Sequence, residues 1–113
     1  MTMPTGLSEK DADALRAFVS AVRDALGPDL VELRLFGSKA RGDDTPESDV
    51  DVMVVVQTDT LEVKNHVYDA AFQVGLTYEV YISPMVVARS VLEDPVWRVT
   101  PFLKAVQQEG IVL

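Results

Sequence analysis

The chain has 113 residues, 48% of them hydrophobic, and carries a formal net charge of −8. This length fits one domain, residues 1–113, with enough apolar side chains for a core, so the chain should fold alone or as a small oligomer. The acidic balance argues against broad binding of nucleic-acid backbone, because such binding depends on many Lys and Arg contacts. The absence of cysteine excludes a disulfide framework, a cysteine-based zinc site and a cysteine nucleophile.

The first residues predict no export signal. They contain no basic region followed by an apolar run, and the sequence nowhere holds the roughly 18 uninterrupted apolar residues of a membrane span. We therefore expect neither secretion nor membrane association, and a cytoplasmic location suits a chain without cysteine.

The first third of the sequence predicts a helix and then a strand. Apolar residues recur at helical spacing from about Glu9 to Leu26, Ser8 opens a segment that resembles a capping box, and Gly27-Pro28 supplies a stop. From Leu30 to Phe36 apolar and charged residues alternate, which is the period of a half-buried strand. We expect the helix to cover the sheet that contains this strand.

The next stretch carries the chemistry. Gly37-Ser38 opens one or two helical turns that end near Gly42, and a loop rich in Gly, Asp, Thr, Pro and Ser follows. A second strand, Asp49 to Val56, is apolar on both faces after its opening residues, which is typical of a central strand covered on both sides. Successive side chains of a strand point to opposite faces, so Asp49 and Asp51 stand on one face, about 6–7 Å apart.

These residue types suit a divalent metal beside a phosphate. Mg²⁺ prefers oxygen ligands and is usually held by one or two carboxylates together with substrate phosphates. The free backbone N–H groups at the helix start after Gly37-Ser38 favour an anion such as a phosphate. Asp49 and Asp51 are therefore candidate metal ligands, and the whole arrangement suits an in-line phosphoryl or nucleotidyl displacement.

The motif of Gly37-Ser38, ten residues and Asp49-Val50-Asp51 resembles the G-S-x10-D-x-D signature of the DNA polymerase β-like nucleotidyltransferases. The fuller pattern, G-S-x-A-R-G-D with S-D-x-D, is similar to that of the minimal nucleotidyltransferases, known as antitoxin partners of HEPN-domain toxins. The resemblance implies an α+β fold in which helices pack on a small mixed β-sheet.

The resemblance also implies a role for each residue of the motif. The Ser38 hydroxyl and the Gly37-Ser38 amides would hold the terminal phosphates of a nucleoside triphosphate, and the two aspartates would hold one or two ions of Mg²⁺ or Mn²⁺. Lys39 and Arg41 would neutralise phosphate charge, and Arg41 is the better suited because a guanidinium binds phosphate oxygens in a fork. For both cations the alternative is a solvated charge near a turn.

The middle of the chain predicts a second long helix. Thr60 can cap it, its buried stripe runs from Val63 to Val74, and Gly75 lies just past its expected end. His66 is the only histidine in the chain and falls on the polar side of this helix. We interpret it as an exposed helix residue rather than a catalytic base.

The segment from Thr77 to Ser83 predicts the next strand, with Glu79 as its only acidic residue. One interpretation is an edge strand that keeps Glu79 in water, since edge strands often carry charge. The resemblance favours another, because the superfamily places a third Asp or Glu on a later strand as metal ligand and possible general base. We therefore include Glu79 among the candidate catalytic and metal-binding residues.

The last third of the sequence predicts short elements. Residues 90–93 can form one helical turn, Thr100-Pro101 opens a helix that Gly110 stops, and residues 111–113 can form a last strand. Trp97 is interpreted as a packing or interface anchor rather than a base-stacking platform.

Three rival motifs fail. The sequence after Gly37 lacks the G-x4-G-K-[ST] frame of a P-loop, and the residues after Asp49 lack the Gly and Glu of an EF-hand calcium loop. Ser38 does not lie in the G-x-S-x-G elbow of a hydrolase nucleophile, so a phosphate-binding hydroxyl is its better role.

The function that the resemblance implies is transfer of a nucleotide, AMP from ATP, to the tyrosine of a HEPN-domain toxin. The chain is too short for the additional domain that shapes the acceptor site in larger relatives, so a partner protein or a second subunit should complete the site. Two alternatives stay open: a non-catalytic nucleotide-binding antitoxin or adaptor, and nucleotidylation of a small molecule such as an aminoglycoside.

Overall fold

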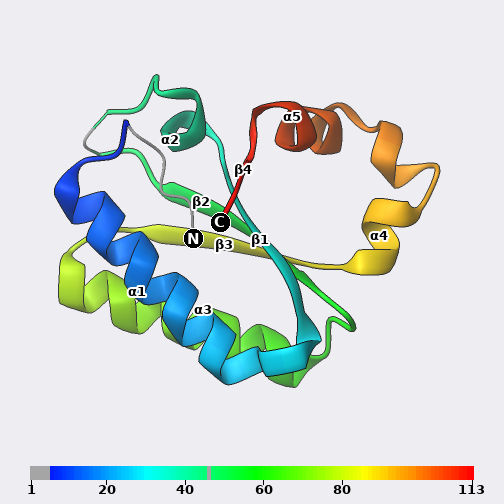
Figure 1. Cartoon of the computed structure of the whole chain (residues 1–113), viewed down its shortest axis with the longest axis horizontal. Coiled ribbons are helices and arrows are strands. Elements are labelled where there is room, and N and C mark those ends of the chain that lie inside the picture. Colours follow the sequence, from blue (N-terminus) through cyan, green and yellow to red (C-terminus); the bar gives the residue numbers. More distant parts are fainter. Residues whose placement is uncertain (1–5, 46) are drawn as a thin grey trace.

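The computed structural model describes residues 6–45 and 47–113. Its elements follow in the order α1 (Glu9–Leu26), η1 (Gly27–Asp29), β1 (Leu30–Phe36), α2 (Ser38–Arg41), β2 (Val50–Val56), α3 (Leu61–Tyr78), β3 (Ile82–Ala88), α4 (Arg89–Glu93), η2 (Trp97–Val99), α5 (Pro101–Glu109) and β4 (Ile111–Val112) (Figure 1). None of the helices in this described part combines the length and hydrophobicity that a bilayer span requires.

The strands form one mixed sheet in the order β3-β2-β1-β4. Strand β1 runs antiparallel to β2 and to β4, whereas β2 and β3 are parallel. A parallel pair needs a crossover connection, and α3 provides it. Figure 1 shows α1 and α3 side by side on one face of the sheet and α5 on its other side, whereas α2 follows the end of β1 and packs Ala40 against the core on the α1 side. The predicted α+β fold with a small mixed sheet is confirmed.

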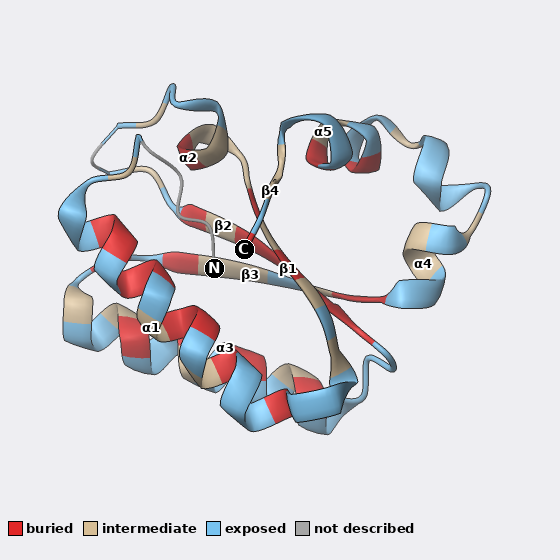
Figure 2. Cartoon of the chain, viewed as in Figure 1, coloured by how far each residue is buried: buried red, intermediate tan, exposed pale blue. Residues whose placement is uncertain are grey.

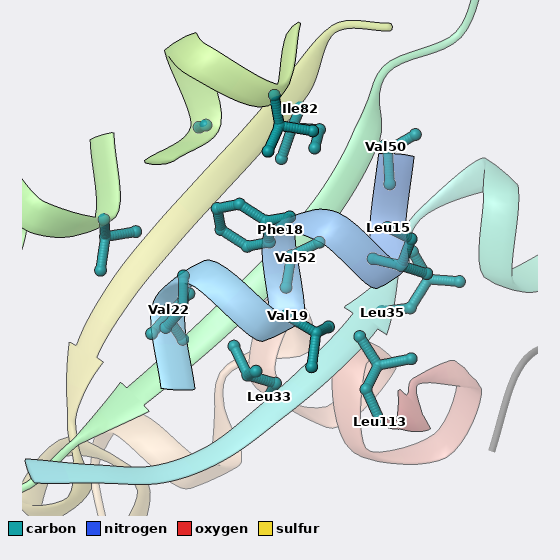
Figure 3. Close-up of a cluster of buried hydrophobic side chains, with 14 of the residues drawn as sticks. Leu15, Phe18, Val19, Val22, Leu33, Leu35, Val50, Val52, Ile82 and Leu113 are labelled. Carbon is teal, nitrogen blue, oxygen red and sulfur yellow. The ribbon is translucent and has the colours of Figure 1, made fainter. Parts of the chain in front are cut away.

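The main core fills the space between the sheet and the helix pair α1 and α3 (Figure 3). Helix α1 begins at a capping residue, since the Ser8 hydroxyl accepts a hydrogen bond from the Asp11 amide at 3.1 Å. Its apolar stripe then packs on the sheet, and Figure 2 shows the buried positions along it. The largest fully buried side chains of this core are Leu15, Phe18, Val22, Leu35, Val50, Val52, Val54, Val56 and Val67.

A second, smaller cluster covers the opposite face of β2. Met53 and Val55 pack there with Leu103 and Val106 of α5 and with Val87 of β3. At the edge of this cluster the rings of β1 Phe36 and α5 Phe102 meet edge to face, with centroids 5.7 Å apart. Strand β2 is therefore buried on both faces, as its sequence predicted.

The structure differs from the sequence prediction at the junction between α3 and β3. The helix does not stop at Gly75 but continues to Tyr78, and β3 begins only at Ile82. Gly75 lies inside the helix where the chain returns closely, since a Cβ there would be 3.1 Å from the Val80 carbonyl oxygen. Glu79 is the C-cap in the left-handed conformation, with φ of 55°, and this residue reverses the chain. The predicted strand from Thr77 was therefore wrong up to residue 81.

Candidate active site

The centre of the candidate site is the contact between Gly37 and Asp51. Gly37 links β1 to α2 with φ of 76°, a conformation that favours glycine. A Cβ at this position would collide with Oδ2 of Asp51. Two requirements thus act on one residue, because only glycine allows both the turn and the approach of the carboxylate. The structure places the aspartate strand directly beside the Gly37-Ser38 turn, as the sequence predicted.

Strand pairing fixes the position of Asp51 in the sheet. It is paired with Phe36 on β1 and with Ser83 on β3, so it lies at the end of a central strand with a neighbour on each side. Residues paired across a sheet share a face, so the Ser83 hydroxyl stands on the same face as the Asp51 carboxylate. Sequence reasoning did not single out Ser83, because its register with Asp51 depends on where β3 begins.

The electrostatics of the aspartate pair suit a cation. Asp51 is half-buried, whereas Asp49 is exposed at the rim of the strand. Burial raises the pKa of Asp51, the negative charge of Asp49 raises it further, and the positive charge of Arg41 opposes both effects. The charged form of Asp51 is thus disfavoured first by burial and then by the charge of Asp49, and a bound divalent cation would favour that charged form.

The first amides of the short helix α2 are available for an anion. The amides of Ala40 and Arg41 both donate to the Gly37 carbonyl, each at 3.1 Å. The amides of Ser38 and Lys39 precede these bonds and belong to the unpaired first turn of a helix. The Ser38 side chain is half-buried beside them.

Arg41 is the cation of this turn that faces the site. Its guanidinium is 43% exposed and contacts Asp43 at 3.1 Å and Glu109 of α5 at 3.5 Å. Hydrogen bonding and charge from Asp43 raise the pKa of Arg41, with a smaller contribution from Glu109. Exposed ion pairs of this kind are weak, so an incoming phosphate can compete for the guanidinium.

Lys39, in contrast, does not face the site, and its predicted role at the phosphates was wrong. Its side chain is 1% exposed, and its ammonium donates to Asp11 at 2.7 Å, Asp44 at 3.0 Å and the Thr45 carbonyl at 3.2 Å. These three acceptors match the three donors of an ammonium. Neither predicted alternative describes this residue, since it is a buried structural cation rather than a phosphate ligand or a solvated charge.

Asp11 and Asp44 are therefore residues that sequence reasoning missed. Burial alone would lower the pKa of Lys39, but hydrogen bonds and charges from Asp11 and Asp44 outweigh burial and raise it. The hydrogen bond from Lys39 lowers the pKa of Asp44. One signal was present, because Asp11 occupies the last position of the capping box with a side chain shorter than the usual Glu or Gln. We name Asp11, Lys39 and Asp44 the lysine cluster.

Glu79 requires a second correction. It lies at the end of α3, not on a strand of the sheet, and its side chain is exposed. Among the described residues, no group of three or more His, Cys, Asp or Glu side chains is arranged to hold a metal ion. The argument that put Glu79 on the face of Asp49 and Asp51 fails, because strand alternation does not apply at this position. His66 is exposed on α3, as expected.

Comparisons with known proteins show the family to which the chain belongs. A family model described as a nucleotidyltransferase domain matches residues 15–107. Two proteins of Methanocaldococcus jannaschii, named "Putative protein adenylyltransferase MJ0141" and "Putative protein adenylyltransferase MJ0604", are 31% and 33% identical to this chain. Each alignment covers 88% of this chain and 94% of the relative.

Two solved structures share the fold. A chain of a toxin-antitoxin crystallised with AMP-PNP matches with a TM-score of 0.56 and 17% identity, over 93% of this chain and 72% of that one. A crystal structure from Sulfolobus solfataricus, described as "a putative nucleotidyltransferase", matches with a TM-score of 0.50 and 16% identity, over 96% and 90% of the two chains.

The family match includes β1, the Gly37-Ser38 turn and both aspartates, which together build the site described above. The relatives align along nearly their whole length. The chain belongs to the nucleotidyltransferase domain family, as a minimal nucleotidyltransferase of the DNA polymerase β-like superfamily.

Proposed function

We propose that this nucleotidyltransferase moves AMP from ATP to a hydroxyl group of a partner protein, and that it needs Mg²⁺ to do so. The observation that carries the proposal is the approach of the Asp51 carboxylate to Gly37. This contact supports a single site, because it puts one of the two candidate metal ligands directly beside the candidate phosphate turn.

The choice of nucleotide and acceptor is supported by the relatives. Both relatives carry the name "Putative protein adenylyltransferase", and the structural neighbour was crystallised with the ATP analogue AMP-PNP. That neighbour is a toxin-antitoxin, which supports a toxin as the partner. With the resemblance described above, we propose that the partner is a HEPN-domain toxin, that a tyrosine hydroxyl is the acceptor, and that the chain acts as the antitoxin.

The residues present fit a divalent metal. The pair of Asp49 and Asp51 offers hard oxygen ligands. A bound cation would stabilise the ionised Asp51 carboxylate against burial and against the charge of Asp49. When bound, Mg²⁺ would neutralise charge on the triphosphate. Because Glu79 lies off the sheet, the proposal assigns the metal to the two aspartates alone.

The remaining residues bind and orient the nucleotide. The Gly37-Ser38 turn and the Ser38 hydroxyl would receive phosphate oxygens, and Arg41 would leave its weak surface partners to bind them. The acceptor oxygen then forms a bond to the α-phosphorus while the bond from that phosphorus to the β-phosphate oxygen breaks. Pyrophosphate leaves, and the hydroxyl proton passes to water at the exposed rim beside Asp49.

The proposal is tested by intact-mass measurement. The purified chain is incubated with Mg²⁺, each of the four nucleoside triphosphates in turn, and the protein encoded by the adjacent gene. We expect a mass increase of one AMP on that protein with ATP, and none with the double variant Asp49→Asn/Asp51→Asn. Inhibition of the partner without any adduct would reject transfer and favour a binding antitoxin.

A further inference from the structure

Helix α3 exposes a row of large apolar side chains. Tyr68, Phe72 and Leu76 follow one another at intervals of four residues and are 49%, 61% and 64% exposed. This spacing puts them on one stripe, next to the stripe that packs into the core. Leu61 at the start of α3 and Tyr81 beyond its end, 74% and 70% exposed, continue the row. We name these five residues the α3–β3 surface.

The α3–β3 surface is hollowed where the helix meets the sheet. A cavity of about 640 Å³ opens between α3 and β3, with Tyr68, Phe72, Leu76 and Tyr81 in its walls. Such a volume accepts large side chains from another molecule. Exposed apolar residues that gather around a hollow in this way mark an interaction site more often than isolated ones do.

The adjoining sheet edge disfavours pairing with another strand. Strand β3 is an edge strand of the sheet, and its third residue is Pro84. Proline has no N–H for a ladder hydrogen bond, so it protects an edge against strand addition. A partner would therefore dock on this surface through side chains, with an amphipathic helix as the fitting element.

The charges around the surface select the kind of partner. The residues that line this cavity and the neighbouring hollow on α3 include Glu62, Asp69 and Glu79 but no Lys or Arg. A second copy of this chain, with its net charge of −8, would bring acidic residues against acidic residues. A helix with apolar anchors flanked by Lys and Arg complements the surface instead.

The surface ends beside the candidate active site. Ser83 lines the cavity and is also the β3 neighbour of Asp51. The Tyr81 carbonyl accepts a hydrogen bond of 2.9 Å from the amide of Val50, which stands between the two aspartates. Helix α3 covers the face of the sheet opposite to Asp51, so a protein docked on the α3–β3 surface would reach the end of β2 around the edge strand β3, at Tyr81 and Ser83.

We propose that the α3–β3 surface is the docking site of the acceptor protein, which presents an apolar helix flanked by basic residues and thereby brings its hydroxyl to Asp51. This inference rests on the proposed function and assigns the surface that completes the site. It gives the nucleotidyltransferase domain a surface of its own by which to recognise the acceptor.

The test compares two equally drastic substitutions of exposed aromatic residues. Phe72→Glu lies in the middle of the surface. Trp97→Glu lies on η2, outside it, and replaces a side chain of similar exposure, 56% against 61%. Trp97 is exposed rather than packed, so this variant also tests the rival interface anchor that the sequence suggested, and a loss of binding at Trp97 in place of Phe72 would overturn the inference. Circular dichroism and the melting temperature establish that both variants fold. The dissociation constant for the adjacent-gene protein is then measured by calorimetry at two salt concentrations.

We expect Phe72→Glu to weaken binding by about 30-fold or more, the effect of losing a central interface anchor. Trp97→Glu should bind like the wild type, and higher salt should weaken the wild-type complex, because acidic and basic residues face each other. Equal binding by Phe72→Glu and the wild type would overturn the inference. So would a wild-type dimer in sedimentation that Phe72→Glu dissolves, since a second copy would then occupy the surface.

Mass analysis of the same complexes separates this inference from the proposed function. If the wild type and Phe72→Glu modify the partner equally well, the docking site is wrong and the transfer stands. If the complex depends on Phe72 but no adduct forms, the docking site stands and the transfer is wrong. Asp51→Asn provides the reference, since it should bind the partner and fail to modify it.

Discussion

The two faces of strand β2 have opposite tasks. On one face Val50, Val52 and Val54 are fully buried against α1 and α3 (Figure 3). The other face begins with Asp51, half-buried and with a raised pKa, before Met53 continues into the α5 cluster. One seven-residue strand thus stabilises the fold with one set of side chains and carries a charged site with the alternate set.

This comparison explains why the site can hold two carboxylates that repel each other. A partly buried carboxylate that a neighbouring carboxylate repels is destabilising, and the surrounding structure must offset that cost. The buried valines belong to the same strand, so their packing holds the backbone of Asp51 in position against the repulsion between the two carboxylates. Stability and chemistry should therefore respond to different substitutions within the same strand.

Val52→Asp should have the largest effect. It places a carboxylate among fully buried apolar side chains, and an unpaired buried charge costs several kcal/mol. Since small domains are stable by only about 5–15 kcal/mol, we expect a largely unfolded chain in circular dichroism. A cooperative thermal transition near that of the wild type would contradict the division between the faces.

Asp51→Asn should have the opposite profile. Removing one central electrostatic group typically lowers a rate by about 10²–10³-fold, and we expect a loss of this size in AMP transfer. The substitution removes a partly buried charge that Asp49 repels, so the melting temperature without metal should not fall. Mg²⁺ with ATP should no longer raise it. A destabilised variant with normal turnover per folded molecule would refute the assignment.

Lys39→Ala should destabilise the protein without removing a phosphate ligand. It leaves Asp11, 8% exposed, without its cation, and breaking a buried ion pair costs about 3 kcal/mol. Chemical denaturation measures this loss, and the Michaelis constant for ATP of the folded fraction should stay unchanged. A raised Michaelis constant for ATP with normal stability would show instead that Lys39 binds the phosphates.

The same variant predicts a pH dependence. The folded-state pKa of Lys39 is raised. Its contribution to the free energy of unfolding is therefore complete below the ordinary lysine pKa of about 10.4 and is lost as pH rises through the raised pKa. The folded-state pKa of Asp44 is lowered, so its contribution is complete above about 3.9 and is lost as pH falls through the lowered value. The stability difference between wild type and Lys39→Ala should therefore be flat at neutral pH and shrink at both extremes.

Arg41→Ala should act on the nucleotide alone. Its ion pairs with Asp43 and Glu109 are exposed, so we expect an unchanged melting temperature. Loss of one charge-assisted hydrogen bond should raise the Michaelis constant for ATP by about tenfold. Arg41→Lys provides the control, because it keeps the charge and loses the fork, and it should recover only part of the affinity.

Glu79→Gln should have the smallest effect. With Glu79 at the C-cap of α3, we expect transfer within about twofold of the wild type, as for an ordinary surface substitution. A loss as large as that of Asp51→Asn would restore the third carboxylate that the sequence suggested, and would require the end of α3 to rearrange.

Local sequence patterns predicted the parts of the fold in which the spacing of apolar residues matches the helix or strand that they form. The helical stripe of α1, the alternation in β1 and the two apolar faces of β2 are confirmed at nearly the expected bounds. The approach of Asp51 to the Gly37 turn followed from two strands and the loop between them. These features depend on residues that are close in sequence, or on apolar patterns that can be buried in only one way.

The errors at Lys39 and Glu79 have a common cause. The partner of Lys39, Asp11, lies 28 residues earlier on another element, and nothing in the local pattern says which way a lysine on a turn points. The stretch around Glu79 alternates like a strand, but the close return of the chain at Gly75 lets α3 run on. Contacts between residues distant in sequence determine both the direction of the Lys39 side chain and the end of α3. Such contacts cannot be predicted from the local pattern of a single sequence.

The lysine cluster has a consequence for how the enzyme meets its nucleotide. It ties the first turn of α1 to the loop between α2 and β2, and the same loop is closed by a hydrogen bond of 2.9 Å from the Thr45 amide to the Ser48 hydroxyl. Described residues at both ends of this loop are thus tied to α1 and to each other when the chain folds, by contacts that the proposed nucleotide would not replace. Binding of the proposed nucleotide should therefore carry little entropic penalty for ordering these residues, and the enzyme would be ready to act as soon as it is folded.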